Sequence, residues 1–332
     1  MFGLDSLLDD GEPPSTEVSF DPSFREVVPG TRVRGEIRRR SGVEVGFDLG
    51  DEAFMAMACL AVLALGPAGV SQRLVERLAA KARRCEQGGR YRCFVDVTEF
   101  PADTDSTATA AGALYEHGLL TDAALLVSAR ELLRAAAPRG RPEVRPDTVM
   151  VYWDDGSAAA SARGLKQDPV VCANALYTVA LARPLLGPAE GAGVVAATEA
   201  YVHDHLTSGR YLEGTRYYPD PAAFLYALAR LCARFPAHTI RLGEPLREAL
   251  ANGPCAADRP WHALHLSLLV TAADLAGAPS GQDRRRAALT GLRRADGSWP
   301  PGPYYRMGRF TVYFGSRLFT TLMAVRALRG PA

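Results

Sequence analysis

The feature that most constrains the fold is a pattern of paired helices that repeats along the chain. Between residues 50 and 330, apolar residues recur at helical intervals in one segment after another, and aromatic or glycine-rich loops separate the pairs. The unit is roughly 50 residues long and recurs about six times, which is the signature of stacked helix pairs. Six such pairs can close into a ring whose inner helices surround a cavity. The sequence therefore predicts an all-α fold, an (α/α)6 toroid of helix hairpins.

The expected helices fill most of the chain after residue 50. They cover residues 53–65, 70–85, 105–117, 121–136, 169–182, 190–206, 220–235, 243–252, 261–277, 280–294 and 316–328. Residues 1–50 are irregular in pattern, although the weak alternation of 33–38 and 43–47 would suit a small hairpin. We expect residues 1–50 to pack over the main body as a tail or lid, and residues 51–332 to form the toroid.

Composition and charge exclude several classes of function. A net charge of +1 gives no basic field for nucleic acid, so we expect no nucleic-acid partner. No apolar run reaches about 18 residues and no basic-then-apolar segment opens the chain, so we expect neither a membrane span nor a signal peptide. The six cysteines are scattered without metal-ligand spacing, which favours a reducing compartment, the cytoplasm, and no structural zinc. Abundant Ala and Arg suggest a bacterial gene of high GC content.

A short acidic stretch stands where a loop turns into a helix. Its sequence over residues 100–108 is Phe-Pro-Ala-Asp-Thr-Asp-Ser-Thr-Ala. One interpretation is a helix start, because Asp and Ser side chains accept hydrogen bonds from the first amides and negative charge suits the positive end of the helix dipole. That interpretation explains one of the two carboxylates and leaves the other open.

Two stretches resemble known protein families. Asp103, Asp105, Thr107 and Ala108 match the Asp-x-Asp-Asp-Thr-Ala box of the class II terpene cyclases, from which Ser106 departs. Residues 293–299, Arg-Arg-Ala-Asp-Gly-Ser-Trp, resemble the Gln-x-x-x-Gly-x-Trp repeat of the terpene cyclase and protein prenyltransferase toroids. The likeness covers residues 50–330 as fold and only these two stretches as motif. It implies that Asp105 protonates a carbon–carbon double bond or an epoxide of a linear isoprenoid.

Such a reaction sets requirements on the acid. An ordinary Asp has a pKa of about 3.9 and is almost wholly ionised at neutral pH. Burial and a nearby second carboxylate both raise this pKa, and the two Asp residues of the box supply the like charge. We therefore assign Asp105 as the proton donor, with Asp103 and Ser106 orienting it.

The resulting carbocation needs a dry pocket of electron-rich rings, and the loops between helices are rich in aromatic residues. Arg216 among aromatics could clamp a diphosphate or a carboxylate, and Asn174 lies within an otherwise apolar helix. The residues expected to bind substrate are Trp153, Asn174, Arg216, Tyr217, Tyr218, Tyr305, Phe310 and Phe314.

The sequence favours a class II-type terpene cyclase with a small isoprenoid as substrate and no metal or other cofactor. Magnesium would matter if the substrate were a diphosphate, and then Arg216, Arg306 or Arg309 should govern binding. Three alternatives stay open: a glycan-cleaving α/α barrel with paired carboxylates, a prenyltransferase-like toroid, and a non-catalytic helical scaffold. The family places its acid between two helical domains, whereas this chain has room for one, so residues 1–50 or a second copy in a homodimer would have to close the pocket.

Overall fold

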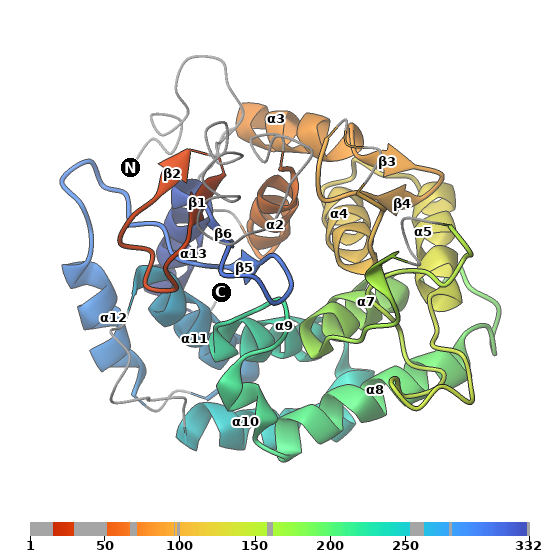
Figure 1. Ribbon diagram of the computed structural model, residues 1–332. Coiled ribbons are helices and arrows are strands. Elements are labelled where there is room, and N and C mark those ends of the chain that lie inside the picture. The colour runs from red at the N-terminus through yellow and green to blue at the C-terminus, as the bar shows by residue number, and fades with distance from the viewer. Residues whose placement is uncertain are drawn as a thin grey trace.

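The computed structural model describes residues 16–29, 52–66, 72–95, 97, 100–157, 162–252, 262–278 and 281–330. Within them, six helices form a closed inner ring in which each helix packs against the next and the last packs against the first (Figure 1). These helices are α2 (Phe54–Leu63), α4 (Thr104–Glu116), α7 (Pro169–Leu181), α9 (Pro221–Arg234), α11 (Ala263–Ala276) and α13 (Arg317–Arg329).

A second layer of helices surrounds this ring in Figure 1. It contains α3 (Gln72–Arg83), α5 (Asp122–Arg134), α8 (Ala192–Thr207), α10 (Pro236–Asn252) and α12 (Gln282–Gly291), and the 3-10 turn η4 (Arg210–Glu213) follows α8. The layers follow from the sequence pattern: α2 is buried at every position, whereas α3 buries Leu74 and Leu78 and exposes Arg73 and Glu76. The predicted toroid of helix pairs is confirmed.

The observed helix bounds lie close to those expected from the sequence, with α10 as the main exception. This helix begins at Pro236 rather than at Gly243 and contains Pro245. Proline lacks a backbone N–H, which the first turn of a helix does not need, so Pro236 starts the helix where a chain break was expected.

A small antiparallel sheet joins the two ends of the described chain. Strands β1 (Glu17–Ser19), β2 (Val28–Pro29), β5 (Tyr305–Arg306) and β6 (Tyr313–Gly315) lie in the order β2-β1-β6-β5. Val18 is paired with Phe314, so the N-terminal strand extends a hairpin of the last loop. A separate hairpin, β3 (Glu86–Gln87) and β4 (Arg90–Tyr91), precedes the acidic stretch. The hairpin expected at 33–38 and 43–47 lies outside the described residues.

Glu52 links the N-terminal segment to the hairpin of the last loop. Its buried carboxylate accepts hydrogen bonds from the Thr16 hydroxyl, from the Met55 amide at 2.9 Å and from the Tyr305 hydroxyl at 3.0 Å. Burial raises the pKa of this carboxyl above its usual value. Three separate segments therefore meet on one buried acid.

The Gly-Ser-Trp stretch has the structural role that its sequence suggests. The Trp299 indole N–H donates to the Leu289 carbonyl at 2.7 Å, and the Arg293 guanidinium lies 5.4 Å from the indole ring centre. Gly297 adopts a φ of 84°, which favours glycine in the turn before the tryptophan. This stretch fastens α12 and α13 together and lies outside the cavity.

Candidate active site

The ring encloses a cavity of about 380 Å³. Asp103, Asp105 and Ser106 line it at its buried end, while Phe310, which also lines it, is 46% exposed. Most of the wall between them is aromatic or apolar. The lining residues include Phe54, Cys93, Phe94, Phe100, Val151, Tyr152, Val171, Tyr217, Tyr218, Tyr305, Met307 and Phe314.

The start of α4 carries the two carboxylates of the acidic stretch. Asp103 is the N-cap: its carboxylate accepts from the Ser106 amide at 2.7 Å and from the Ser106 hydroxyl at 2.8 Å. Asp105 lies in the first turn, and its side chain is free of this capping role. The helix-start interpretation therefore applies to Asp103, and Asp105 is left facing the cavity.

Two neutral donors hold the Asp105 carboxyl. The Asn174 amide nitrogen donates to its Oδ1 at 2.8 Å, and the Tyr218 hydroxyl donates to its Oδ2. Asn174 is oriented in turn by Arg230, whose guanidinium donates to the amide oxygen at 3.1 Å and lies 4.4 Å from the ring centre of Tyr177. Because Arg230 occupies the amide oxygen, Asn174 can present only its NH₂ group to Asp105.

The environment of Asp105 shifts its acidity strongly. Burial and the neighbouring Asp103 charge raise the pKa of Asp105 to about 7, against the bonds from Tyr218 and Asn174 that lower it. Burial also raises the pKa of Asp103 to about 6, with the Ser106 bonds opposing that shift. At neutral pH a substantial fraction of Asp105 is therefore protonated.

The loop of residues 214–219 brings Tyr218 to the acid. Asp168, the N-cap of α7, accepts from the Tyr217 amide at 3.2 Å, and Thr215 and Tyr218 close the turn between them. Gly214 has a φ of 72°, and a Cβ there would lie 2.5 Å from the Pro219 carbonyl oxygen, so only glycine fits this turn. Arg306 donates to the Arg216 carbonyl at 2.9 Å and to the Thr215 carbonyl at 3.0 Å, which ties the loop to strand β5.

The exposed end of the cavity is basic. Arg163, Lys166, Arg216 and Arg309 all line it, and they are half-buried or exposed. Arg163 lies over the Phe100 ring at 4.2 Å, and Arg216 lies 6.0 Å from the ring centre of Tyr217.

Most of the residues expected at the site come together in this cavity. Asp103, Asp105 and Ser106 line it, as do the expected binding residues Arg216, Tyr217, Tyr218, Tyr305, Phe310 and Phe314. Tyr218 has a further contact that the sequence did not suggest, since it binds the acid directly. Asn174 also contacts Asp105, and it does so from behind the cavity wall.

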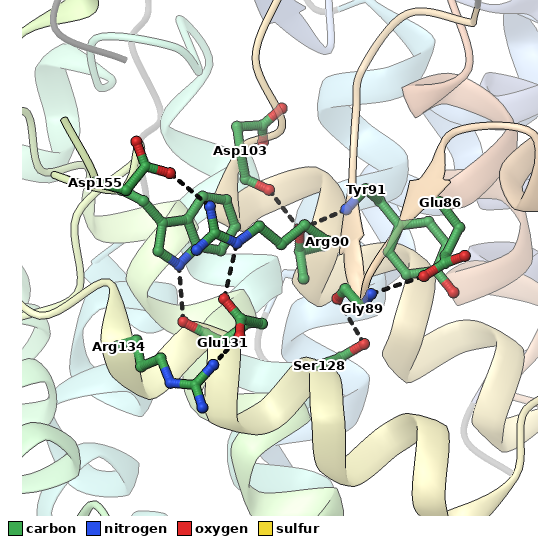
Figure 2. A network of polar contacts seen from close by, with 11 residues as sticks. Glu86, Gly89, Arg90, Tyr91, Asp103, Ser128, Glu131, Arg134 and Asp155 are labelled. Atoms are coloured by element: carbon green, nitrogen blue, oxygen red, sulfur yellow. Dashed lines mark hydrogen bonds and ion pairs between the residues drawn. The ribbon is translucent and has the colours of Figure 1, made fainter. Parts of the chain in front are cut away.

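Trp153, expected to bind substrate, lies elsewhere. Its indole N–H donates to the Glu131 carbonyl at 2.9 Å, and the Arg90 guanidinium packs over its ring at 4.3 Å. Figure 2 shows the surrounding polar network, in which Arg90 bridges Glu131 and Asp155. The Trp153 indole is thus packed between a loop and α5, where it has a structural role, and it does not line the cavity.

Several residues of the site were missed in the sequence. Arg230 is an isolated cation in the buried helix α9, and that pattern could have indicated a polar network. Arg163 and Lys166 lie in a segment of the sequence without regular periodicity, so their approach to Arg216 had no signal along the chain. Among the described residues, no group of three or more His, Cys, Asp or Glu side chains is placed to hold a metal ion.

Comparisons with known proteins place this geometry in context. No family model matches the chain. Drimenol cyclase drtB from Aspergillus calidoustus is 31% identical over 169 residues, which are 49% of this chain and 29% of that protein. The aligned part is therefore less than a third of the relative's length.

Solved structures match nearly the whole chain. A variant of type II terpene cyclase MstE from Scytonema, in complex with geranylgeranyl dihydroxybenzoate (substrate), has a TM-score of 0.56 at 13% identity and covers 98% of this chain and 93% of its own. The chain has the class II terpene cyclase fold. Two further structures share this terpene cyclase-like architecture. One is ent-copalyl diphosphate synthase from Streptomyces platensis, with a TM-score of 0.59 and 14% identity, and the match covers 88% of this chain and 53% of that one. The other is a protein from Actinoplanes, with a TM-score of 0.62 and 17% identity, and the match covers 98% of this chain and 96% of that one.

No helix in the described part of this terpene cyclase-like chain is long and apolar enough to cross a membrane.

Proposed function

We propose that this chain is a class II-type terpene cyclase that starts the cyclisation of a linear isoprenoid by protonating it from Asp105. The observation that carries the proposal is the placement of Asp105, a buried acid with a pKa raised to about 7, at the closed end of an aromatic cavity. The fold shared with type II terpene cyclases supports the same activity.

The chemistry of the first step balances without a further reactant. The O–H bond of protonated Asp105 breaks as the π electrons of a double bond, or an epoxide oxygen, take the proton. The Asp105 carboxylate that remains keeps the bonds from Tyr218 and Asn174, which stabilise the new negative charge. The positive charge that forms on carbon lies among rings such as Tyr305 and Phe314, which stack at 4.6 Å. Cyclisation then follows as further double bonds attack the cation, and the last cation is discharged by losing a proton to solvent or by taking up water with loss of a proton.

The same contacts weigh against the glycan-cleaving alternative. A glycosidase needs two carboxyl groups that are both available at the scissile bond. Here both Asp103 oxygens are bonded to Ser106 at the helix start, so one member of the pair has a structural task.

Our proposal also includes the kind of substrate, a small-molecule isoprenoid, and the location of the protein, the cytoplasm. In the described part of the chain, Cys59, Cys85, Cys93, Cys172 and Cys232 are free thiols.

The proposal is tested by incubating the purified chain with linear isoprenoid alcohols, epoxides and diphosphates in deuterated water. Because an exchangeable carboxyl proton starts the reaction, we expect an olefinic alcohol or diphosphate to give a cyclic product that carries one deuterium on carbon, and an epoxide to give a cyclic alcohol whose deuterium on oxygen exchanges away. For the alcohol and diphosphate substrates, a cyclic product without deuterium on carbon would show that ionisation of a leaving group, rather than protonation, starts the reaction. If every substrate is recovered unchanged, the proposed activity is wrong.

A further inference from the structure

The size of the cavity limits the length of the apolar chain that it can hold. A dry cavity of about 150 Å³ holds benzene, so a packed carbon atom takes up about 25 Å³. By that measure the cavity of about 380 Å³ holds roughly 15 carbon atoms, or about three isoprene units. Chains of four and six units would need about 500 Å³ and about 750 Å³.

The buried end of the cavity is closed around Asp105. The Tyr218 hydroxyl and the Asn174 amide both donate to its carboxyl, so both sides of this group are occupied. The Tyr218 ring packs edge-on against Tyr304 at 5.4 Å, and Tyr304 packs in turn against Phe319 at 4.4 Å. All four partners are buried, so an apolar chain that reaches Asp105 ends there.

The aromatic wall consists of rings that hold one another in place. Phe54 contacts Tyr305 at 5.2 Å between ring centres, Tyr305 stacks on Phe314 at 4.6 Å, and Phe314 contacts Phe94 at 6.4 Å. Phe94 contacts Phe100 at 4.9 Å, and all five rings line the cavity. None of the five residues is more than 8% exposed. A packed row of this kind resists displacement, so the width of the cavity is fixed by the fold.

The exposed end offers no further apolar volume. Arg163, Lys166, Arg216 and Arg309 line it, and they are half-buried or exposed. An apolar chain laid over these cations would remove water from them, which is unfavourable, and would keep much of its own surface in water. Carbon atoms beyond the aromatic wall therefore add little to binding.

We propose that the cavity selects a linear isoprenoid of three isoprene units, roughly 15 carbons, over shorter and longer chains. This inference rests on the proposed function and adds the chain length of the substrate. A chain of this length fills the space between the closed end and the exposed end, and places its last double bond at Asp105. A chain of two units leaves part of the cavity empty, and a chain of four units leaves apolar carbons outside the wall.

Binding can be measured without turnover in an Asp105→Asn protein, so the test is independent of whether Asp105 is the acid. The probes are geraniol, farnesol and geranylgeraniol, which share one head group and differ by one isoprene unit at each step. The readout is the dissociation constant by calorimetry. We expect farnesol to bind about tenfold or more tightly than geraniol, because one more unit is buried, and geranylgeraniol to bind no more tightly than farnesol.

Three results would overturn the inference. They are a further tenfold gain from farnesol to geranylgeraniol, equal affinity for geraniol and farnesol, and no binding of any of the three alcohols. Failure of the proposed function looks different: farnesol then binds best to Asp105→Asn, while the wild type forms no cyclic product from any chain. Conversely, efficient cyclisation of a chain of four units by the wild type would keep the proposed function and refute the chain length.

A variant of the wall tests whether its rings set the limit. Phe94→Ala in the same background opens about 150 Å³, the space of one benzene molecule, which admits one more isoprene unit. Geranylgeraniol should then bind about tenfold or more tightly than farnesol. Phe224→Ala is the matched control, because Phe224 is 0% exposed, packs against His205 and does not line the cavity. It should keep the order of the parent protein.

A correctly folded Phe94→Ala protein that keeps the parent's order of affinities would contradict the assignment of the wall. Should Phe94→Ala unfold, Phe94→Leu opens part of the same space and should narrow the difference between farnesol and geranylgeraniol. The order of the three alcohols on the parent protein decides the chain length in either case.

Discussion

The carboxyl group of Asp105 is subject to opposing influences, of which those that favour the protonated form prevail. Burial and the Asp103 charge keep it protonated, while the hydrogen bonds from Tyr218 and Asn174 favour its anion. A carboxyl that was only buried would hold its proton too firmly, and one that was only hydrogen-bonded would have lost it at neutral pH. The combination gives an acid that is loaded near pH 7 and whose conjugate base has partners ready.

The first prediction at this scale concerns the pH dependence of activity. Since Asp105 must be protonated to react, kcat/KM should fall by about tenfold per pH unit above pH 7, near its raised pKa. Tyr218→Phe removes the donor to Oδ2, so the pKa should rise further and the fall should move up by about one pH unit. The same variant should lower kcat, because the anion it leaves is less stabilised. The measurement is the pH profile of both proteins.

Tyr217→Phe is the control, because Tyr217 lines the cavity without a hydrogen bond to Asp105. It should leave the position of the pH limb unchanged. The account of the acid would be contradicted if Tyr218→Phe and Tyr217→Phe moved the limb equally.

The same raised pKa affects stability with a defined sign. Between the unfolded pKa near 3.8 and the folded pKa of about 7, the folded chain holds a proton that the unfolded chain has released. The contribution of Asp105 to the free energy of unfolding therefore falls as pH rises through that window. An amide at this position does not ionise, so Asp105→Asn should be more stable relative to the wild type at pH 8 than at pH 4.

At the scale of elements, the short sheet carries a prediction about the N-terminal segment. Val18 in β1 is 0% exposed and is paired with Phe314, which lines the cavity. Val18→Asp would bury an unpaired carboxylate, so we expect a loss of several kcal/mol of stability and a matching loss of activity.

Val27→Asp is the matched control, because Val27 belongs to the same segment and is 41% exposed. It should melt near the wild-type temperature in a thermal denaturation experiment. If Val18→Asp melts there too, the pairing of this strand with the last loop does not stabilise the fold.

The helices were predictable from the sequence, and the sheet was not. Helical periodicity is local, so α7 and α9 could be placed within a residue or so from their apolar pattern and their Asp-Pro starts at Asp168 and Asp220. The pairing of Glu17–Ser19 with Tyr313–Gly315 joins opposite ends of the chain through strands too short to show alternation.

The candidate site shows the same difference between local features, which the sequence predicts, and long-range contacts, which it does not. The acidic stretch was identifiable because all its residues are neighbours in the sequence, and loop aromatics such as Tyr305 could be expected near the ring's cavity. The partners of Asp105 come from α7 and from the loop before α9, and Arg230 acts through Asn174. Such contacts depend on how the helices are packed around the ring, and no local pattern encodes them. For the same reason Trp153 was misplaced: nothing in its neighbourhood along the chain indicates Arg90.

At the scale of the whole molecule, the question is whether one toroid is enough to form the active-site cavity. The acid, its partners, the aromatic wall and the cations at the exposed end of the cavity all come from this single ring and its loops. The type II terpene cyclase MstE matches over 93% of its own length, so the fold also occurs there without a second toroid in the matched chain.

The central claim is that Asp105 in this single toroid is the acid that starts cyclisation, and one measurement tests it most directly. Product formation by the purified chain is compared between the wild type and Asp105→Asn, with Asp122→Asn as control because Asp122 occupies the first turn of α5 outside the cavity. We predict that Asp105→Asn lowers turnover by about a thousandfold or more while it still folds and melts cooperatively, and that Asp122→Asn keeps wild-type turnover. Full turnover by Asp105→Asn would contradict the account.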